Sequence, residues 1–326
     1  MKVGRVQLLR LAVAALMLIL IVRYVHKLDW HAIVQSTESA SIPLLALSAL
    51  GNLPLIWLKA LRMKLLIGNR VRTGKLMGFF VTSYAADNLV MSQAGLGVRV
   101  AMLHRESVPL ATAVTTQALE KVLEAIGLAI LTLPLLGTQH LAPRLRTPLE
   151  WCLLAGGIGV VLLGAFALLG SSKLRFLRKV ADTARLLRSP LLAGKVLALT
   201  MAAWLVEVLM VMSALAALHY TLPPLTASIL VLLAVNIAAL IPGLPANVGP
   251  FEVACMLALG TFGVKGETVL GFALLYHALH TIPVTLAGLP GMNRLTKLRR
   301  NEVDSSPEGL QGLNRSDIET ADLETR

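Results

Sequence analysis

Residues 236–252 read NIAALIPGLPANVGPFE, and this stretch interrupts a chain that otherwise alternates long apolar runs with short basic loops. One apolar run stops at Pro242 and Gly243. The chain then turns and restarts at Gly249, and Glu252 falls in the first turn of the next apolar segment. A turn rich in proline and glycine between two apolar segments indicates a broken helix or a helical hairpin.

The apolar segments on either side of this turn, residues 225–241 and 251–262, are short for membrane spans, which need about 20 apolar residues each. Non-helical backbone at membrane depth persists only where protein or a water-filled cavity satisfies its N–H and C=O groups. We therefore predict a re-entrant helical hairpin, with Pro242, Gly243 and Gly249 as its hinges. A tight loop between two ordinary spans is the alternative, and it would leave both spans short.

The composition is that of a polytopic membrane protein. Hydrophobic residues make up 56% of the 326 residues and charged residues 15%, and the mean hydropathy is +0.73. A net charge of +12 would suggest a nucleic-acid partner in a soluble protein. Here the basic residues lie between apolar runs, so they indicate topology and contact with anionic lipid headgroups, and we expect no nucleic-acid binding. Cys152 and Cys255 lack metal or redox spacing, and no cofactor is predicted.

A second interrupted stretch covers residues 76–103, LMGFFVTSYAADNLVMSQAGLGVRVAML. As a single span it would place Asp87 near the bilayer centre, at a cost of roughly 2.5–3.5 kcal/mol. A hairpin that enters from the cytoplasmic side, with Gly95 and Gly97 at its break, instead puts the polar residues around a tip and returns the chain to Arg99. We predict this second re-entrant hairpin.

Six further apolar runs are predicted to span the membrane. Their approximate limits are 8–22, 42–57, 109–136, 151–169, 196–218 and 269–289. Basic residues cluster before the first span and after the second, fourth and sixth, and the cluster after the second runs from Lys59 to Lys75. By the positive-inside rule these segments are cytoplasmic, so both termini are predicted to lie on the cytoplasmic side of the membrane.

These assignments give the two halves of the membrane domain, residues 1–137 and 138–292, the same plan turned upside down. We therefore predict an all-α fold of six spanning helices plus two re-entrant hairpins in an inverted repeat, the architecture in which transporters place a substrate site near the midplane. Residues 293–326 follow the last span and are polar, with acidic residues in excess from Asn301 onward. We expect them to form a disordered cytoplasmic tail.

Ionisable residues within apolar segments are candidate functional residues, because such groups normally face a bundle interior or a cavity. Glu120 and Glu124, at positions i and i+4, share one face of the span 109–136, and Lys121 lies beside that face. They either contact a headgroup or relay protons, or they form a structural ion pair that locks two helices together. Glu207, in the fifth span, is expected to pair across the bundle.

The remaining candidates each have a functional and a structural interpretation. Arg99 either contacts phosphate through its guanidinium or extends to the membrane interface. Glu252 sits at a helix N-terminus, where it either caps the helix or binds a ligand. His277 and His280, at i and i+3, form a proton relay or a metal site, or they pack and hydrogen-bond within the bundle.

The two interrupted stretches resemble one known family. PGLPANVGPFEVACMLALGTFGV (242–264), LLYHALHTIPVTLAG (274–288) and NLVMSQAGLGVRVAMLHRESVPLATAVTTQALEKVLEAIGL (88–128) are similar to signatures of the flippase-type transmembrane domain of lysylphosphatidylglycerol synthases. This domain also occurs in stand-alone bacterial membrane proteins. The resemblance covers roughly residues 5–290. Val98 stands where the family has a glutamate, and Lys121 and His277 stand where it has arginines, so each departure loses or softens a charge that would affect headgroup specificity.

The resemblance implies translocation of a phospholipid or lipid-linked precursor across the bacterial inner membrane. No aminoacyl-transfer domain follows, so we expect no lysyl transfer and no enzymatic activity. The halves would rock around a headgroup of a membrane lipid held between the hairpin tips. A non-transporting scaffold, or a membrane partner of a lipid- or glycan-modifying enzyme, is the alternative. The predicted substrate-binding residues are Asn88, Arg99, Glu120, Lys121, Glu124, Asn236, Glu252 and His277.

Overall fold

The computed structural model describes residues 37–137, 150, 154, 157–158, 189–240, 245–264 and 266–304, with side chains as far as residue 297. All regular secondary structure in these residues is helical, which confirms the predicted all-α class for this part of the chain. The predicted span 8–22, most of the predicted span 151–169, and the predicted hinges Pro242 and Gly243 lie outside the described residues.

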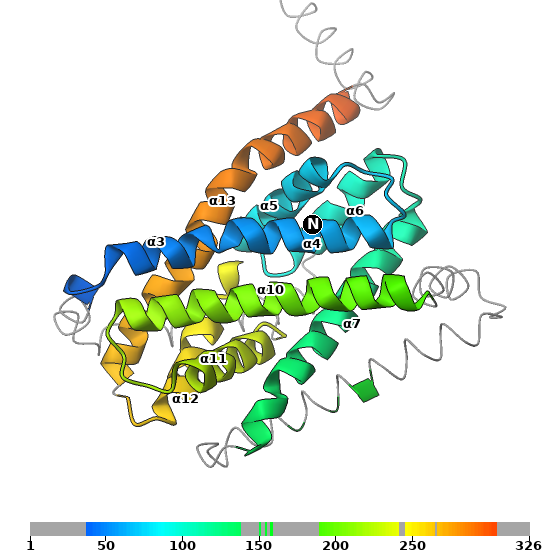
Figure 1. Ribbon diagram of the computed structural model, residues 1–326. Helices are drawn as coiled ribbons and strands as arrows, with labels where there is room; N and C mark the ends of the chain where they lie inside the picture. The colour runs from blue at the N-terminus through cyan, green and yellow to red at the C-terminus, as the bar shows by residue number, and fades with distance from the viewer. Residues whose placement is uncertain are drawn as a thin grey trace, which may run out of the picture.

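Two long helical rods lie side by side and run in opposite directions (Figure 1). The first rod consists of two successive helices and the second of one, with the bounds α3 Ile42–Leu50, α4 Asn52–Leu66 and α10 Pro190–Ala217. The backbone N–H of Ser41 donates to the carbonyl of Ala217 at 2.9 Å, at the start of one rod and the end of the other. Further along the rods, Arg62 Nη1 of α4 donates to Thr200 Oγ1 of α10 at 3.3 Å. These contacts fix the antiparallel register of the rods.

Each rod is followed along the chain by a helical hairpin and then by a long helix. The first hairpin is α5 and α6, and it leads to α7. The second is α11 and α12, with a short 3-10 helix η2 between them, and it leads to α13. The bounds are α5 Thr73–Leu89, α6 Ala94–Arg105, α7 Leu110–Thr132 (continued by the 3-10 helix η1 Leu133–Gly137), α11 Pro224–Ala238, η2 Pro245–Asn247, α12 Pro250–Gly260 and α13 Gly266–Asp304.

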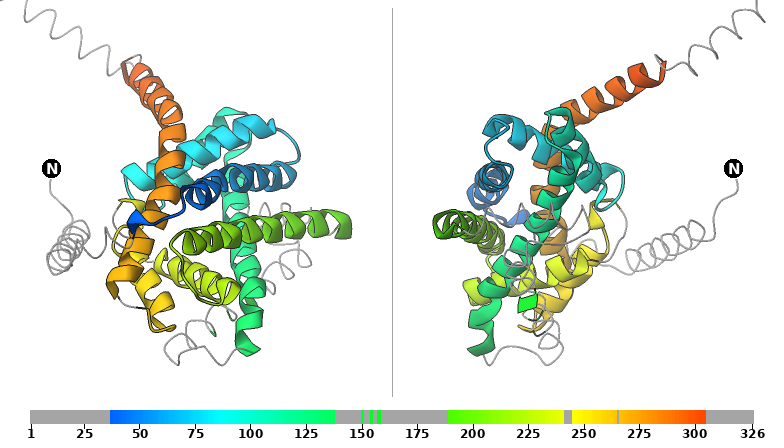
Figure 2. Two further views of the ribbon diagram at one scale, coloured as in Figure 1. Left: turned by 60° about the vertical axis from the view of Figure 1, so that its left-hand side comes forward. Right: turned by 90° about the vertical axis from the view of Figure 1, so that its right-hand side faces the viewer.

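The packing repeats together with this order. Helix α4 contacts α5 as α10 contacts α11, α6 contacts α7 as α12 contacts α13, and α5 lies against α13 as α11 lies against α7. The rods α4 and α10 contact each other, and each contacts both α7 and α13. Exchanging the helices of one half for those of the other leaves this set of contacts unchanged. Helices α7 and α13, which run across the rods, also point in opposite directions (Figure 2), as expected for two inverted copies.

Helix α13 packs closely on α5, and two glycines make this possible. A Cβ atom at Gly288 would collide with the backbone oxygen of Val81, and one at Gly291 would collide with the hydroxyl of Thr82. Interfaces between membrane helices commonly use small residues in this way, because close backbone approach increases van der Waals contact. The first hairpin is therefore tied to the last long helix.

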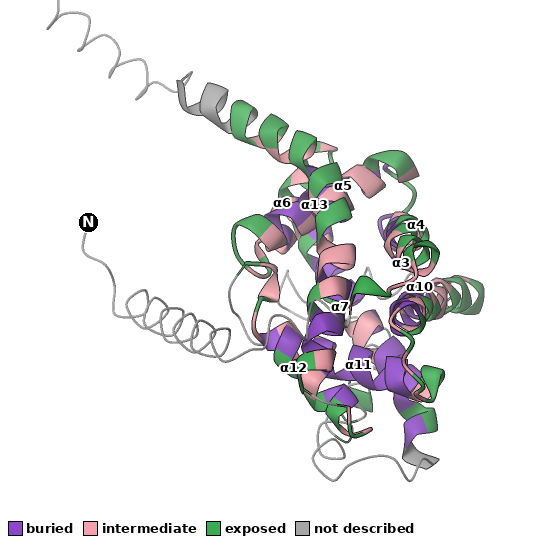
Figure 3. Cartoon of the chain, turned by 90° about the vertical axis from the view of Figure 1, so that its left-hand side faces the viewer, coloured by how far each residue is buried: buried purple, intermediate pink, exposed green. Residues whose placement is uncertain are grey.

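Large apolar side chains cover the outward faces of the two rods. Leu50, Leu53 and Trp57 are exposed on the first rod, and Leu205 and Leu209 are exposed on α10. Figure 3 shows the complementary pattern, with α11 largely buried and the far end of α13 exposed. An apolar exterior of this extent marks a surface that contacts membrane or protein, because isolated soluble proteins rarely expose one.

Three helical segments in the described residues are long and apolar enough to cross a membrane, by length and composition: Ile42–Leu66, Pro190–Ala217 and Gly266–Lys297. They correspond to the predicted spans 42–57, 196–218 and 269–289. The predicted span 109–136 forms α7, and three charged residues near its middle set it apart from these three. The total of six spans and the re-entrant position of the hairpins remain predictions.

The second span, predicted to end at Trp57 or a little beyond, is longer in the structure. Helix α4 continues to Leu66, because apolar residues recur in the sequence after the first cations. Leu66 itself is buried. Lys59 and Arg62 therefore lie within the helix, although the cation count had assigned them to a cytoplasmic loop.

Helix α13 continues past residue 293, where the predicted tail begins. No proline or glycine interrupts residues 292–304, and α13 continues through them to Asp304. The first part of the expected disordered tail is thus helical, and residues 305–326 lie outside the described residues.

The first hairpin turns earlier than predicted. The turn covers residues 90–93 and ends at Gln93, whose φ of 71° is left-handed, so Gly95 and Gly97 lie inside α6 and are not hinges. Gly95 has another role, which is close contact with α5. Its N–H donates to Asp87 Oδ1 at 2.8 Å, and a Cβ atom there would collide with the backbone oxygen of Ser83. In the second hairpin, Gly249 has a φ of 95° at the start of α12, in a region that favours glycine.

Candidate functional site

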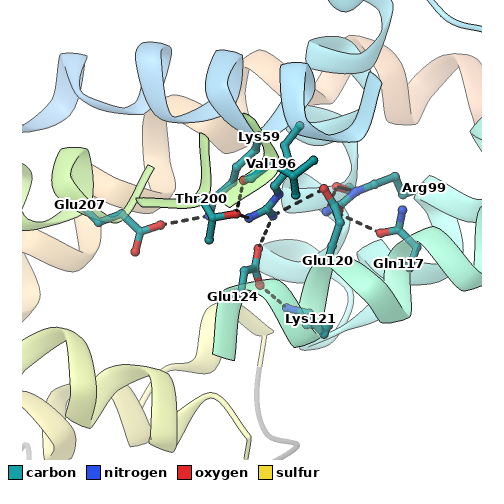
Figure 4. A network of polar contacts seen from close by, with 11 residues as sticks. Lys59, Arg99, Gln117, Glu120, Lys121, Glu124, Val196, Thr200 and Glu207 are labelled. Atoms are coloured by element: carbon teal, nitrogen blue, oxygen red, sulfur yellow. Dashed lines mark hydrogen bonds and ion pairs between the residues drawn. The ribbon is translucent and has the colours of Figure 1, made fainter. Parts of the chain in front are cut away.

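Glu120, in the middle of α7, is buried between two arginines (Figure 4). Arg62 Nη2 of α4 donates to Glu120 Oε1 at 3.5 Å, and Arg99 Nη1 of α6 donates to Glu120 Oε2 at 3.4 Å. All three residues are buried. A buried carboxylate is tolerated only when it is paired and hydrogen-bonded, and here each arginine serves one of its oxygens.

Arg99 is held entirely by groups of the first half. Its Nε and Nη2 donate to Ser83 Oγ at 3.1 and 2.8 Å, and its Nη1 also donates to Gln117 Oε1 at 3.0 Å. The guanidinium lies 4.2 Å from the centre of the Phe80 ring, in cation–π range. Arg99 thus points into the bundle, and the interpretation that it extends to the membrane interface is wrong.

Arg62 links three helices, and its side chain is only 1% exposed. Besides Glu120, it donates to Glu124 Oε1 of α7 at 3.1 Å and to Thr200 Oγ1 of α10 at 3.3 Å. Its buried Nε has no hydrogen-bond partner in the described residues. Glu124 Oε2 accepts a hydrogen bond from Lys121 at 3.3 Å, and the Lys121 side chain is 65% exposed. Lys121 therefore reaches the site from outside, whereas Arg62 is enclosed by it.

An ion pair joins the two rods next to Arg62. Lys59 Nζ of α4 lies 3.0 Å from Glu207 Oε1 of α10, and both side chains are largely buried. The predicted pairing of Glu207 across the bundle is thus confirmed, and its partner is Lys59. We call the seven ionisable residues around this place the charge cluster: Lys59, Arg62, Arg99, Glu120, Lys121, Glu124 and Glu207.

A small cavity lies within the charge cluster, between the two halves of the chain. Its volume is about 30 Å³, enough for a water molecule or two and too small for a phosphate-bearing headgroup. Trp204 lines it, and its buried Nε1 is a second donor without a partner in the described residues, after Arg62 Nε. The lining residues are Lys59, Arg62 and Glu124 from the first half, and Thr200, Ala203, Trp204, Glu207 and Asn236 from the second.

The second hairpin carries a separate polar group at the start of α12. Glu252 Oε2 accepts the backbone N–H of Gly249 at 2.6 Å, so the capping interpretation of Glu252 is confirmed. Its other oxygen, Oε1, lies 2.7 Å from Nδ1 of His277 on α13. The second ring nitrogen of His277, Nε2, lies 2.9 Å from the carbonyl of Ala246 in η2, and Phe251 stacks on the ring at 4.3 Å. No group of three metal-ligating side chains gathers anywhere in the described residues.

The predicted site residues therefore fall into three places. Arg99, Glu120, Lys121 and Glu124 lie together in the charge cluster, and Asn236 lines the cavity while its amide donates to the Leu232 carbonyl of its own helix at 2.8 Å. Glu252 and His277 form the separate group on the second hairpin. Asn88 lies in neither place, because its amide donates to Thr285 Oγ1 at 2.8 Å and joins α5 to α13.

Comparison with known families settles what kind of chain this is. Residues 7–288 match the family described as the lysylphosphatidylglycerol synthase TM region. The chain belongs to this family. The resemblance drawn from its two interrupted stretches is thereby confirmed. Neither the curated proteins nor the solved structures contain a significant match to the chain.

As a member of the lysylphosphatidylglycerol synthase TM family, the chain is a membrane protein of a group associated with lipid handling. The charge cluster and the second polar group both lie within the matched residues. Val98, one of the departures from the family pattern, directly precedes the buried Arg99. The two others, Lys121 and His277, each contact a carboxylate of the site.

Sequence reasoning missed the two most central cations, Lys59 and Arg62, together with Trp204 of the second rod. A signal for them was present. Counted from the buried Leu55, Lys59 lies four residues along, Arg62 seven and the buried Leu66 eleven. This spacing places all four residues on one face of a helix. A cation in register with buried leucines belongs to the interior face of a helix, even where other cations nearby indicate a loop.

Proposed function

We propose that this chain moves a phospholipid or a lipid-linked precursor across the bacterial inner membrane, by exposing a headgroup site between its two halves alternately to each side. The observation that carries the proposal is the charged cavity at the interface of the halves, lined by Lys59, Arg62 and Glu124 on one side and by Glu207 on the other. Membership of a lipid-handling membrane family supports it. Alternating access in transporters built from inverted repeats proceeds by movement of one repeat against the other.

The cavity is too small for a headgroup, so its walls must separate for one to bind. Separation of the rods would break the Lys59–Glu207 pair and the contact of Arg62 with Thr200. Unpaired buried charges are strongly unfavourable. A headgroup that carries phosphate and a cationic or hydrogen-bonding group would replace these contacts, with phosphate on the cations and the second group on the carboxylates.

This mechanism changes the roles of two predicted residues. Arg99 was the expected phosphate ligand, but Ser83, Gln117 and Glu120 occupy its donors. We therefore assign the phosphate contact to Arg62 and Lys59, because a guanidinium offers a forked set of donors and Arg62 Nε is unoccupied. Arg99 would instead hold Glu120 in place. No chemical step is assigned to the chain.

The topology belongs to the same proposal. We propose cytoplasmic termini, with the basic segments at the cytoplasmic face attracted to anionic lipid headgroups. A lipid- or glycan-modifying enzyme that supplies or consumes the moved lipid is the proposed partner. The alternative function, a scaffold whose buried charges only hold helices together, is separated from transport by exchanging charges within an ion pair.

The test uses the purified full chain in proteoliposomes that contain headgroup-labelled lipids of anionic, zwitterionic and cationic type and a polyprenyl phosphate. The double variant Lys59→Glu/Glu207→Lys keeps an ion pair between the rods but reverses its polarity beside Arg62 and Glu124. We expect wild-type protein to translocate at least one lipid, and the double variant to retain thermal stability but lose transport. Lys75→Glu/Glu106→Lys, which reverses an exposed pair of the first hairpin, should keep both.

Absence of translocation above protein-free vesicles for every headgroup type would overturn the proposal. Transport by the reversed Lys59/Glu207 variant at the wild-type rate would show that the pair only holds the helices together. Glu207→Gln provides a second variant of similar volume, in case the double reversal does not insert, and it should reduce transport more than stability.

A further inference from the structure

In the polar group on the second hairpin, the donor and the acceptor of each hydrogen bond can be assigned. We call this group the hairpin latch: Glu252 of α12, His277 of α13, and the backbone of Ala246 and Gly249. Glu252 Oε2 accepts the N–H of Gly249, so this carboxylate oxygen carries no proton. The Ala246 carbonyl is an acceptor only, so Nε2 of His277 must carry a hydrogen to bond it at 2.9 Å.

One proton remains to be placed, between Nδ1 of His277 and Oε1 of Glu252, which are 2.7 Å apart. A neutral histidine carries a hydrogen on only one ring nitrogen, and here that nitrogen is already Nε2. Nδ1 would then turn a lone pair toward a carboxylate oxygen that also carries only lone pairs. The contact is a hydrogen bond only if an additional proton is present, either as an imidazolium beside a carboxylate or as a neutral imidazole beside a carboxylic acid.

Turning the imidazole ring over does not remove this requirement. The flipped ring would place carbon atoms where the nitrogens are, at 2.7 and 2.9 Å from two oxygens. Contacts between a C–H group and oxygen have carbon–oxygen distances of about 3.3–3.6 Å, so the flipped ring would be too close to both. The latch as built therefore holds one proton more than a carboxylate and a neutral histidine together.

Other titratable groups surround the latch. Cys255 of α12 interacts electrostatically with Glu252, and Tyr276 of α13 packs on Phe251 beside the His277 ring. His280, one turn further along α13, interacts with His277 and also with Glu207 and Lys59 of the rods. Its buried Nδ1 has no hydrogen-bond partner in the described residues.

We propose that the hairpin latch is a proton-binding site that couples lipid movement to the proton gradient, an inference that rests on the proposed function. With its proton, the latch holds η2 against α13 and the second hairpin is closed. When the proton leaves, histidine keeps its stronger, charge-assisted bond to the carboxylate through Nδ1–H and gives up the bond from Nε2 to Ala246. The turn is then released.

The backbone of the turn favours release once that bond is lost. Ala246 and Asn247 have φ values of 56° and 59°, in the left-handed region that residues other than glycine rarely occupy. His277 is the side chain that bonds the carbonyl of the first of them. Because η2 also contacts α5, release of the turn changes the interface between the two hairpins.

The sign of the pH dependence follows from the proton count. The closed hairpin binds one proton more than the open one, so low pH favours the closed form and rising pH opens it, by up to about tenfold in the open-to-closed ratio per pH unit. Glu252→Gln removes the titration without removing the bonds. The amide oxygen accepts from Gly249 and the amide NH₂ donates to Nδ1, so this variant should stay closed at every pH.

The experiment measures the position of the turn in the reconstituted full chain by pulsed electron paramagnetic resonance. Nitroxides are attached at Val248→Cys, in the turn, and at Leu53→Cys, on the first rod, in a background of Cys152→Ser and Cys255→Ala; both labelled positions are exposed. We expect the wild-type latch to give two distances whose ratio changes as the pH rises, the low-pH distance being that of the closed hairpin. Glu252→Gln should give the low-pH distance throughout, and Glu106→Gln, which changes a partly exposed carboxylate just after α6, should behave as wild type.

The same vesicles report lipid movement under imposed pH gradients, so the two proposals can fail separately. A distance that does not change with pH, or a Glu252→Gln variant that titrates as wild type does, overturns the latch even if lipid still moves. A distance that changes with pH in vesicles that move no lipid supports the latch and removes the translocase. Wild-type transport that responds to the gradient, together with loss of transport in Glu252→Gln, supports both.

Discussion

The two hairpins occupy equivalent places in the two halves, yet they are held in different ways. The first is tied by several contacts that need no proton: Arg99 of α6 bonds Ser83 of α5, the Gly95 N–H bonds Asp87, and Asn88 bonds Thr285 of α13. Glycines of α13 seat it further against that helix. The first hairpin is therefore built as a fixed wall of the site.

In the described residues of the second hairpin, two hydrogen bonds to α13 converge on one side chain, His277. The turn is joined to α13 through His277, and α12 is joined through Glu252 to the same ring. Local stability in a protein follows the density of such contacts, and the elements that move are drawn from the less stable end. In the proposed mechanism, the first hairpin supports the charge cluster and the second is the one that moves.

The largest expected effect is the loss of Arg99. Among the described residues, Arg99→Ala leaves Arg62 as the remaining ion-pair partner of Glu120, and it removes the Arg99–Ser83 bonds that join α6 to α5. Breaking a buried ion pair by removing one partner costs about 3–5 kcal/mol. We expect a large fall in the free energy of unfolding, measured by thermal or denaturant unfolding in detergent. A loss below about 1 kcal/mol would mean that the first hairpin is not anchored through this residue.

A matched pair of glycines in α6 gives the next effect. Gly95→Ala places a Cβ atom against the backbone oxygen of Ser83 and should destabilise the protein by about 1–3 kcal/mol. Gly97→Ala, two residues away, meets no atom within 4 Å. It should leave stability unchanged or raise it by up to about 1 kcal/mol, because alanine favours a helix. Equal effects of the two substitutions in thermal unfolding would contradict the close packing of the first hairpin.

A smaller effect on stability is expected when the imidazole of His277, which holds the second hairpin, is replaced. His277→Gln removes the paired bonds to Glu252 and Ala246 but keeps a polar side chain of similar length. Hydrogen bonds of this kind contribute about 0.5–1.5 kcal/mol each to net stability. The free energy of unfolding should therefore fall by less than in Arg99→Ala, while the pH dependence of the turn disappears. A loss as large as that of Arg99→Ala would mean that the two hairpins are equally fixed.

The smallest expected effect on stability concerns the hydrogen bond that joins the first hairpin to α13. Asn88→Ala and Thr285→Val each remove one side of a single hydrogen bond, and the double variant completes a thermodynamic cycle. We expect a coupling energy of about 0.5–1 kcal/mol and unchanged lipid transport. Loss of transport in Asn88→Ala without loss of stability would return Asn88 to the substrate site, where the sequence had placed it.

Local sequence rules predicted those features that depend on neighbours along the chain. The proline and glycine residues before α12, the capping carboxylate Glu252 and the shared face of Glu120 and Glu124 could all be read in this way. The pairing of Glu207 could also be predicted, because a buried carboxylate in a span needs a partner. That partner is Lys59, which lies 148 positions from Glu207 in the chain. Its identity therefore depends on the antiparallel register of the two rods.

The errors have the same physical origin. Lys59 and Arg62 were counted with neighbouring loop cations, although burial is decided by what packs on the helix face. The glycines Gly95 and Gly97 were assigned to a turn that the chain makes at Gln93 in a left-handed conformation. Gly95 is instead needed for close contact with α5. Contact between helices cannot be predicted from the local sequence alone.

The most direct test of the account is to lock the halves together and measure transport. In the background without native cysteines, a short thiol-reactive cross-linker joins Ser48→Cys of the first rod to Met210→Cys of the second, where the serine hydroxyl lies 2.9 Å from the Met210 carbonyl. A control cross-link between Lys75→Cys and Glu106→Cys stays within the first hairpin. We expect the cross-link between the halves to stop lipid translocation in proteoliposomes, reversibly on cleavage, and the control to leave it unchanged. Undiminished translocation with the halves locked would contradict alternating exposure of a site between them.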